Sequence, residues 1–238
     1  MKICPISPTG WYLSCYTHDE LKELAGELKI TSPPEIREEL LNVISEEIFK
    51  RETSKKPSPE WKGKHGWLNN FDIRHVLTKY EGHNGFKFLG IFRMDFWSFP
   101  ESYKSTRFEP GFDHYGLILH LGGCHKENFV ADHWVCMFID LRNPEIQVEF
   151  FDPAYFGIDD DQVLQDNLGY IYKKIILQLK LTYRKNIRFS YNKNEIQTND
   201  YDCGLYVIDY LIHRINNGTM ENYAPGVLQR KKYFKIEK

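Results

Sequence analysis

The sequence contains few cysteines and no long apolar run. Five cysteines occur in 238 residues, an odd number at widely scattered positions. We therefore expect no disulfide framework, and a reducing intracellular location. No stretch approaches the roughly 18 apolar residues of a membrane-spanning helix, and the first residues lack the apolar segment of a secretory signal. These absences predict a protein with no membrane span.

The sequence also lacks a charge excess of either sign. Lysine and arginine total 31 against 33 aspartates and glutamates. This balance excludes a strongly basic nucleic-acid-binding protein, and we expect no nucleic-acid partner. The closing stretch "QRKKYFKIEK" is basic, and we interpret it as a solvated tail. Internal repeats and low-complexity tracts are absent, whereas aromatic residues are abundant at 15%, which favours broad β surfaces.

Two amphipathic helices are predicted near the N-terminus. Thr17 and Glu20 have the spacing of a capping box at the start of "THDELKELAGELK". Ser32 and Glu35 repeat that spacing before "IREELLNVISEEIFK", with Pro33 suited to a first helical turn. Both segments carry an apolar stripe at helical spacing, so each is expected to bury one face.

A charged connector divides the predicted organisation into two parts. Residues 51–60, "RETSKKPSPE", combine charge with proline and serine, as linkers do. We therefore predict a helical arm over residues 1–55 and a core domain over residues 56–238.

The core changes from helical to β-type patterning. Short runs rich in β-branched and aromatic residues predict five strands, and the turn "LRNPE" indicates that the third and fourth are antiparallel. A helix is predicted over 159–180 and another after Cys203, ending at Asn217-Gly218. Strands and helices that do not strictly alternate indicate an α+β fold. The predicted strands are 86–92, 115–121, 133–140, 146–152 and 187–191.

Cys203 stands where a polar stretch becomes apolar, in "QTNDYDCGLYVIDYL". A cysteine in the first turn of a helix feels the positive end of the helix dipole, which favours the reactive thiolate. Position alone is weak evidence, because isolated cysteines are commonly buried and inert. A catalytic assignment therefore depends on partners.

The predicted sheet supplies such partners. A catalytic thiol needs an imidazole to accept its proton and a third group to orient the ring. His133 begins one strand of the antiparallel pair and Asp152 ends the other, so we expect both at one edge of the sheet. Pro153 restricts Asp152 to extended backbone and stops the strand there. Gln197 is a candidate oxyanion donor together with the backbone N–H of Cys203.

Taken in chain order, these elements form a recognisable pattern. "His133-Trp134", then Asp152, then "QTNDYDCG" resembles the ubiquitin-like-protein proteases, a group that includes SUMO-specific proteases and adenovirus protease. The upstream "GWLNNFDIRHVL" is similar to the Trp-Leu-Asn element of that family. The resemblance covers about residues 67–217. It implies a central mixed sheet packed by helices, and a cysteine peptidase that needs no cofactor.

Within that family the sequence is most similar to the polyprotein-processing proteases of large cytoplasmic DNA viruses, through "HWVCMFIDLR" followed by "EFFD" and a helical arm. This resemblance implies cleavage of a viral polyprotein after Gly-Gly, in the host cytoplasm and virion. It also implies substrate contacts from Trp67, Asn70 and Trp134. Two facing indoles would leave a channel that only unsubstituted backbone can enter. Some viral relatives have Asn where this chain has Asp152.

Two other functions remain open from the sequence. The same residues would serve an isopeptidase that removes ubiquitin-like modifiers, and a non-catalytic relative would only bind such a modifier. The presence of all four candidate catalytic residues argues against the binder. A zinc site is not predicted, because His114, His120, Cys124 and His125 do not have the spacing of a ligand set. The oligomeric state is not set by the sequence.

Overall fold

The structure is a computed structural model that describes most of the predicted core and part of the arm. The described residues are 17–37, 39–40, 43–44, 47, 68, 70–93, 108–121, 133–155, 162–199, 202–226, 228 and 232–234. Four α-helices, two short 3-10 helices and five strands have defined bounds in these ranges. They are α1 (His18–Glu27), α3 (Asn70–Leu77), η3 (Thr78–Tyr80), η4 (His83–Gly85), β1 (Phe86–Arg93), β2 (His114–Leu121), β3 (His133–Asp140), β4 (Ile146–Phe151), α5 (Gln162–Tyr183), β5 (Ile187–Tyr191) and α6 (Cys203–Ile215).

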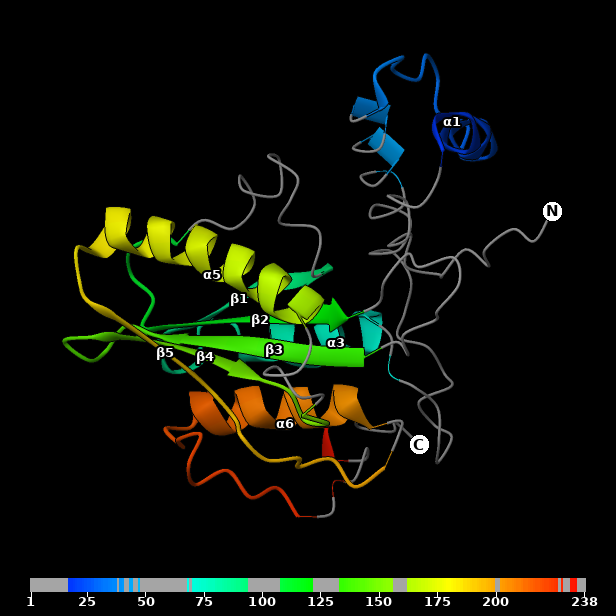
Figure 1. Ribbon diagram of the computed structural model, residues 1–238. Coiled ribbons are helices and arrows are strands. Elements are labelled where there is room, and N and C mark those ends of the chain that lie inside the picture. Colours follow the sequence, from blue (N-terminus) through cyan, green and yellow to red (C-terminus); the bar gives the residue numbers. More distant parts are fainter. Residues whose placement is uncertain are drawn as a thin grey trace.

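A five-stranded mixed sheet forms the centre of the core, in the order β1-β2-β3-β4-β5. The pairs β2–β3 and β3–β4 are antiparallel, whereas β1–β2 and β4–β5 are parallel. Helix α5 covers one face of the sheet and α6 covers the other (Figure 1). All five strands lie where the sequence predicted them, and the α+β prediction is confirmed.

The alternation of side chains along β3 explains why both faces of the sheet are covered. Successive strand residues point to opposite faces, and every residue of β3 is buried. One set packs into the hydrophobic cluster that contains α6, and the other set packs into the cluster that contains α5. The first set is Trp134, Cys136 and Phe138, and the second is Val135, Met137 and Ile139.

Helix α6 is buried along its whole length, because it packs beneath the sheet and against α3. All of its residues except His213 are buried. The chain leaves the helix through Asn217, which has a left-handed φ of 68°. A Cβ on Gly218 would overlap the imidazole of His213, so a larger residue at the next position would displace that ring. The predicted helix end at Asn217-Gly218 is therefore correct.

The N-terminal helices are partly as predicted. Thr17 and Glu20 form the capping box of α1, with both reciprocal hydrogen bonds present. The predicted second cap is wrong, because Ser32 has a left-handed φ of 55° and helical backbone is described only from residue 37. Glu35 instead pairs with Lys22 at 2.6 Å. A tertiary ion pair has replaced the local capping bond.

The described part of the arm has its own small hydrophobic cluster. Its members are Leu21, Leu24, Ala25, Leu40 and Ile44, with Leu28 and Ile30 packed against them. Among the described residues, no member of this cluster comes from beyond residue 44. The division into an arm (1–55) and a core (56–238) stays a prediction.

We therefore expect the core to fold without the arm. Deleting residues 1–55 should leave a cooperatively unfolding protein, because the two main hydrophobic clusters lie entirely within the core. Thermal unfolding of the truncated chain, followed by circular dichroism, tests this expectation. A truncated chain that is insoluble or lacks a cooperative transition would show that the arm completes the core.

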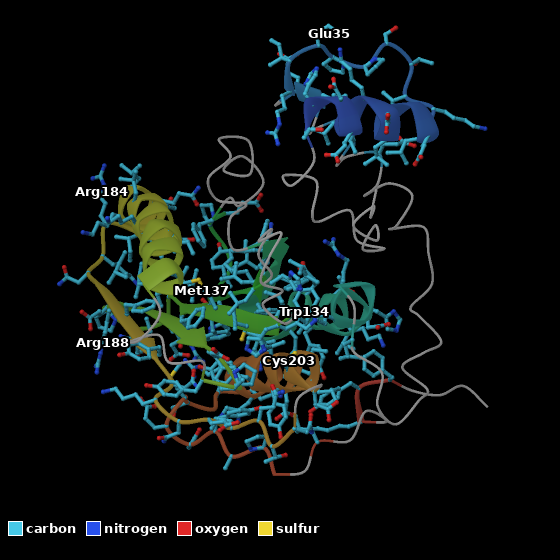
Figure 2. All side chains as sticks on the ribbon, turned by 45° about the vertical axis from the view of Figure 1, so that its right-hand side comes forward. Glu35, Trp134, Met137, Arg184, Arg188 and Cys203 are labelled. Atoms are coloured by element: carbon cyan, nitrogen blue, oxygen red, sulfur yellow. The ribbon has the colours of Figure 1, made fainter. Side chains whose placement is uncertain are left out.

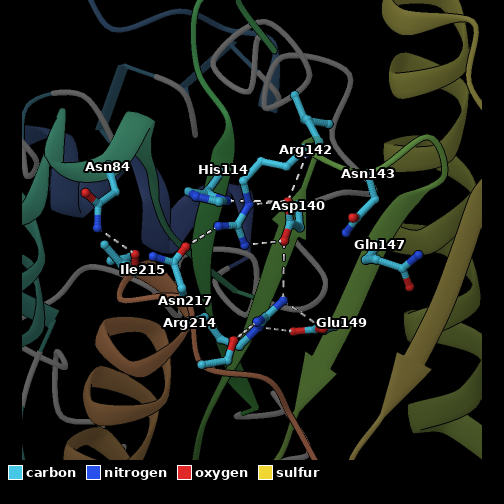
Figure 3. Close-up of polar contacts among 12 residues, drawn as sticks. Asn84, His114, Asp140, Arg142, Asn143, Gln147, Glu149, Arg214, Ile215 and Asn217 are labelled. Carbon is cyan, nitrogen blue, oxygen red and sulfur yellow. Dashed lines mark hydrogen bonds and ion pairs between the residues drawn. The ribbon is translucent and has the colours of Figure 1, made fainter.

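A buried ion network lies at the C-terminal end of α6 (Figure 3). Arg214 reaches Glu149 on β4 at 2.7 Å and Asp140 on β3 at 3.6 Å. Tyr210 donates its hydroxyl to Glu149 at 2.8 Å, and Arg142 binds Asp140 at 2.7 Å. Burial opposes ionisation of Asp140, but the imidazole of His114, 3.6 Å away, and hydrogen bonds from Arg142 outweigh it and hold the pKa of that carboxyl well below its usual range. The network joins α6 to two central strands.

Residues 232–234, the described part of the closing stretch, are docked against the core, contrary to the interpretation from the sequence. Tyr233 and Phe234 are buried. The carboxylate of Asp209 on α6 accepts hydrogen bonds from the hydroxyls of Tyr223 and Tyr233 and from Lys232. A buried acid on the central helix therefore fixes this segment against the core.

Removing Arg214 should destabilise the whole core. Arg214→Ala leaves Glu149 and Asp140 buried without their shared cation, which typically costs roughly 3–5 kcal/mol of unfolding free energy. Urea denaturation measures the loss. Arg188→Ala is the matched control, because Arg188 is an exposed arginine of β5, and its effect should stay within about 0.5 kcal/mol. Equal losses in the two variants would mean that the ion network does not hold α6 in place.

Candidate active site

His133 and Asp152 meet at one end of the sheet. Antiparallel pairing of β3 with β4 sets Cys136 opposite Phe151, so the start of β3 lies beside the end of β4. His133 Nε2 is 2.6 Å from Asp152 Oδ1. Both side chains are buried. The structure thus brings together the two residues that the sequence placed at a common edge.

Asp152 is held on all sides by hydrogen bonds. Its Oδ1 accepts the backbone N–H of Ala154 at 2.9 Å as well as the contact from His133. Its backbone N–H donates to Asn192 Oδ1 at 2.8 Å, and its carbonyl accepts from Asn192 Nδ2 at 2.7 Å. The carboxylate is therefore fully buried but not unsatisfied.

Cys203 is the first residue of α6, and its side chain interacts with His133 closely enough to help raise the pKa of that imidazole. Because His133 Nε2 faces Asp152, the ring nitrogen that remains for the thiol is Nδ1. Asp202 precedes the helix without capping it. The first N–H groups of α6, including that of Cys203, have no acceptor within the helix. Figure 2 shows Cys203 on this helix below the strands.

The electrostatics of the site favour a charged imidazole. Burial alone lowers the pKa of His133, but hydrogen bonds to Asp152 and Cys203 and the charges of both groups outweigh burial and raise the pKa to about 9. His133 is therefore an imidazolium near neutral pH. An imidazolium next to a thiol favours the thiolate, because opposite charges stabilise one another in a buried site.

Gln197 lies in the loop that leads to Cys203. Its side chain is buried, and Nε2 donates one hydrogen to the carbonyl of Asn199. The second hydrogen of this amide is not used by that bond. The Asn199 side chain in turn exchanges two hydrogen bonds with Asp202, each 3.0 Å long. Hydrogen bonds among Gln197, Asn199 and Asp202 thus stabilise the segment that precedes Cys203.

The predicted substrate contacts are only partly described. Trp134 is buried, and its indole N–H donates to the carbonyl of Leu68 at 2.9 Å (Figure 2). A Cβ on Gly204 would lie 3.0 Å from Leu68 and 3.4 Å from Trp134. These three residues therefore pack tightly at the position that follows Cys203. Asn70 begins α3, but its side chain is not described. Trp67 lies outside the described residues.

Two asparagines of this site were missed in the sequence. Asn192 and Asn199 look like ordinary loop residues, because their hydrogen bonds depend on chain folding rather than on spacing. The available signal was local: Asn192 directly follows a strand, where a side-chain amide can replace a backbone partner. Among the described residues no group of three or more His, Cys, Asp or Glu side chains is arranged to hold a metal ion. Cys124 and His125 lie outside them.

Comparison with known proteins shows similarity in fold. No protein-family model matches the chain. The crystal structure of the ASFV pS273R protease is similar with a TM-score of 0.55 and 17% identity, over 93% of this chain and 91% of that chain. The C-terminal Ulp1 protease domain in complex with Smt3, the yeast orthologue of SUMO, matches with a TM-score of 0.49 and 16% identity, over 74% and 84%. The chain has the α+β fold of the ASFV pS273R protease, in agreement with the α+β class that the sequence predicted.

A more specific relative is a viral protein. The chain is 23% identical over 229 residues to "Putative thiol protease R355" of Acanthamoeba polyphaga mimivirus. The match covers 90% of this chain and 63% of the relative, so the chain spans less than two thirds of that protein's length. Both the structural neighbours and this relative carry the name of a protease, as the resemblance seen in the sequence led us to expect. Within the described residues, no helix is long and apolar enough to cross a membrane.

Changing Asp152 should lower the pH at which His133 loses its proton. The charged imidazole stabilises the fold fully below pH 6.5, and this contribution is lost as the pH rises through about 9. Asp152→Asn removes the carboxylate charge but keeps an acceptor, so the pKa of His133 should fall. Asp152→Ala removes both, so the pKa should fall further. NMR titration of the His133 ring measures each value.

The matched control for this titration is Asp113→Asn, which neutralises an exposed aspartate and should leave the His133 titration unchanged. An unchanged His133 pKa in Asp152→Ala would contradict the assigned pairing. Equal shifts in Asp152→Asn and Asp152→Ala would mean that the hydrogen bond adds nothing to the charge.

Proposed function

We propose that the protein is a cysteine peptidase with Cys203 as nucleophile. The observation that carries this proposal is the contact series Cys203–His133–Asp152, in which a thiol at a helix start meets an imidazole held by a buried carboxylate. A merely structural histidine has no need of both partners. The protease fold and the protease relative support the same reaction class.

In the proposed reaction, the sulfur of Cys203 attacks the carbonyl carbon of the scissile bond. His133, which holds the thiol proton as an imidazolium, donates it to the leaving amine, so that an acyl-enzyme and a free amine result. Water then attacks the thioester while neutral His133 accepts its proton, and the sulfur leaves as a thiolate, so that the acid product is released and the thiolate–imidazolium pair is restored. Asp152 stabilises the imidazolium and fixes its tautomer.

Gln197 is the proposed side-chain donor to the oxyanion. Its amide is buried, and one hydrogen is fixed on Asn199, so the other has a defined direction. The N–H of Cys203, in the first turn of α6, is the second proposed donor. Two preorganised donors are the usual arrangement for the tetrahedral intermediate of acyl transfer.

The proposed substrate is a viral polyprotein that is cleaved after Gly-Gly. The relative of viral origin supports a viral role. The close packing of Trp134 and Leu68 at Gly204, the residue that follows Cys203, supports a crowded surrounding for the thiol. Trp67 and Asn70 complete the proposed substrate contacts. A peptide with Cβ atoms at both positions before the cut would need more room than glycine.

Electrophilic probes test this proposal directly. A short peptide ending in Gly-Gly with a reactive C-terminal group should label Cys203, whereas the matched Ala-Ala peptide should react at least about tenfold more slowly. Labelling is measured by mass spectrometry of the intact protein and of the Cys203 peptide. Cys203→Ala is the control, since it should fold but take no label.

Full-length ubiquitin and SUMO with the same reactive group separate the remaining functions. Labelling by either one in preference to the peptide would replace the polyprotein proposal with an isopeptidase. Equal reaction with the Ala-Ala peptide would remove the Gly-Gly specificity but leave the nucleophile in place. If no probe labels Cys203, the protein is not a peptidase of this type, and binding of a ubiquitin-like protein without catalysis would be the better explanation.

A further inference from the structure

Beyond the end of the β4–β5 ladder, a side-chain amide takes the place of the next backbone partner. The parallel ladder reaches Phe150 opposite Tyr191. Beyond it, the side-chain amide of Asn192 binds both backbone groups of Asp152, with an N–H···O distance of 2.8 Å in one direction and 2.7 Å in the other. Both residues are buried. The amide thus occupies the place that a further strand residue would take.

The chemistry of this contact requires an amide. The backbone of Asp152 presents one donor and one acceptor, so its partner must offer one of each in a plane, as only asparagine and glutamine side chains do. Pro153 follows immediately and has no N–H, so the strand cannot continue its ladder beyond Asp152. A carboxylate in place of the amide would face the Asp152 carbonyl with a second acceptor.

Asn192 also connects Asp152 with the loop that carries Gln197. Its Nδ2 group makes a second bond, to the carbonyl of Asn194 at 3.0 Å. Further along the same loop, the N–H of Gln197 donates to the carbonyl of Pro153 at 2.8 Å. Two sets of hydrogen bonds therefore join the segment Asp152-Pro153 to the loop that carries Gln197. One set comes from the side chain of Asn192, and the other is the backbone bond from Gln197 to Pro153.

We propose that Asn192 is a positioning residue for the reaction, acting through Asp152. By fixing both backbone groups of Asp152, Asn192 fixes the direction of the carboxylate towards His133, 2.6 Å away. This inference rests on the proposed function of Cys203 as the nucleophile. Without the clamp, the strand end can shift, the carboxylate contact lengthens, and less of the thiolate–imidazolium pair forms at neutral pH.

The test measures alkylation of Cys203 by iodoacetamide, located by peptide mass spectrometry, at pH 7 and at pH 10. Asn192→Ala should lower the ratio of the rate at pH 7 to the rate at pH 10 by about tenfold, the loss expected for one or two buried hydrogen bonds. Asn186→Ala is the matched control, because it removes an exposed asparagine from the opposite end of β5 and should leave the ratio unchanged. If Asn192→Ala cannot be purified, Asn192→Ser carries the same prediction, since a hydroxyl cannot reach both backbone groups.

A double variant shows whether the effect passes through Asp152. In an Asp152→Ala background, adding Asn192→Ala should change the ratio by less than about twofold, because the group being positioned is already gone. A purely structural role would lower the melting temperature of Asn192→Ala and leave its pH ratio at the wild-type value, which would overturn the inference. A full additional tenfold loss in the double variant would also overturn it.

Failure of the proposed function would look different. In that case wild-type Cys203 would show the same pH 7 to pH 10 ratio as glutathione, a simple thiol. A wild-type ratio above that of glutathione, together with an unaffected Asn192→Ala variant, refutes the positioning role alone.

Discussion

The register of β3 against β4 is the constraint on which the rest of the site depends. Because Cys136 pairs with Phe151, His133 and Asp152 come to the same end of the sheet and meet at 2.6 Å. A slip of one residue would turn every side chain of β3 to the opposite face. The alternating apolar residues of β3, buried against α5 and α6, oppose such a slip. Core packing and site geometry are therefore set by the same pairing.

Helix α6 has charged groups at both ends, and the helix dipole complements the charge expected at each end. Its N-terminal end, the positive end of the helix dipole, lies at Cys203, where a thiolate is stabilised. Its C-terminal end carries His213 and Arg214, basic groups that complement the negative end. Arg214 in turn is bound by buried Glu149. The buried ion pair between Arg214 and Glu149 thus anchors the C-terminal end of the helix that begins at Cys203.

Much of this arrangement was predictable from the sequence because the signals were local. The strands follow from short β-branched and aromatic runs, and the meeting of His133 with Asp152 follows from a tight turn between two of them. The errors have non-local causes. Ser32 has capping spacing, but the pairing of Glu35 with Lys22 takes away the second half of the box.

Two other features depend on tertiary contacts, which the spacing of residues along the sequence does not indicate. The C-terminal stretch looked solvated from its lysines, yet Asp209, 23 and 24 positions earlier, binds Lys232 and Tyr233. Asn192 reads as a loop residue, and only the folded chain brings its amide to Asp152, 40 positions away. Polar residues that work through distant backbone carry no periodic pattern. For this reason the three proposed catalytic residues were visible in the sequence, whereas the asparagines that hold them were not.

The central claim is that Cys203 and His133 act as a thiolate–imidazolium pair. The most direct measurement is the rate of iodoacetamide alkylation of Cys203 at pH 6.5 in the wild-type protein and in His133→Ala, with the buried thiol of Cys136 followed in the same digest as an internal reference. The account predicts that the wild-type rate exceeds the His133→Ala rate by at least about tenfold, because an adjacent imidazolium stabilises negative charge on the attacking sulfur. Equal rates in the two proteins would contradict it.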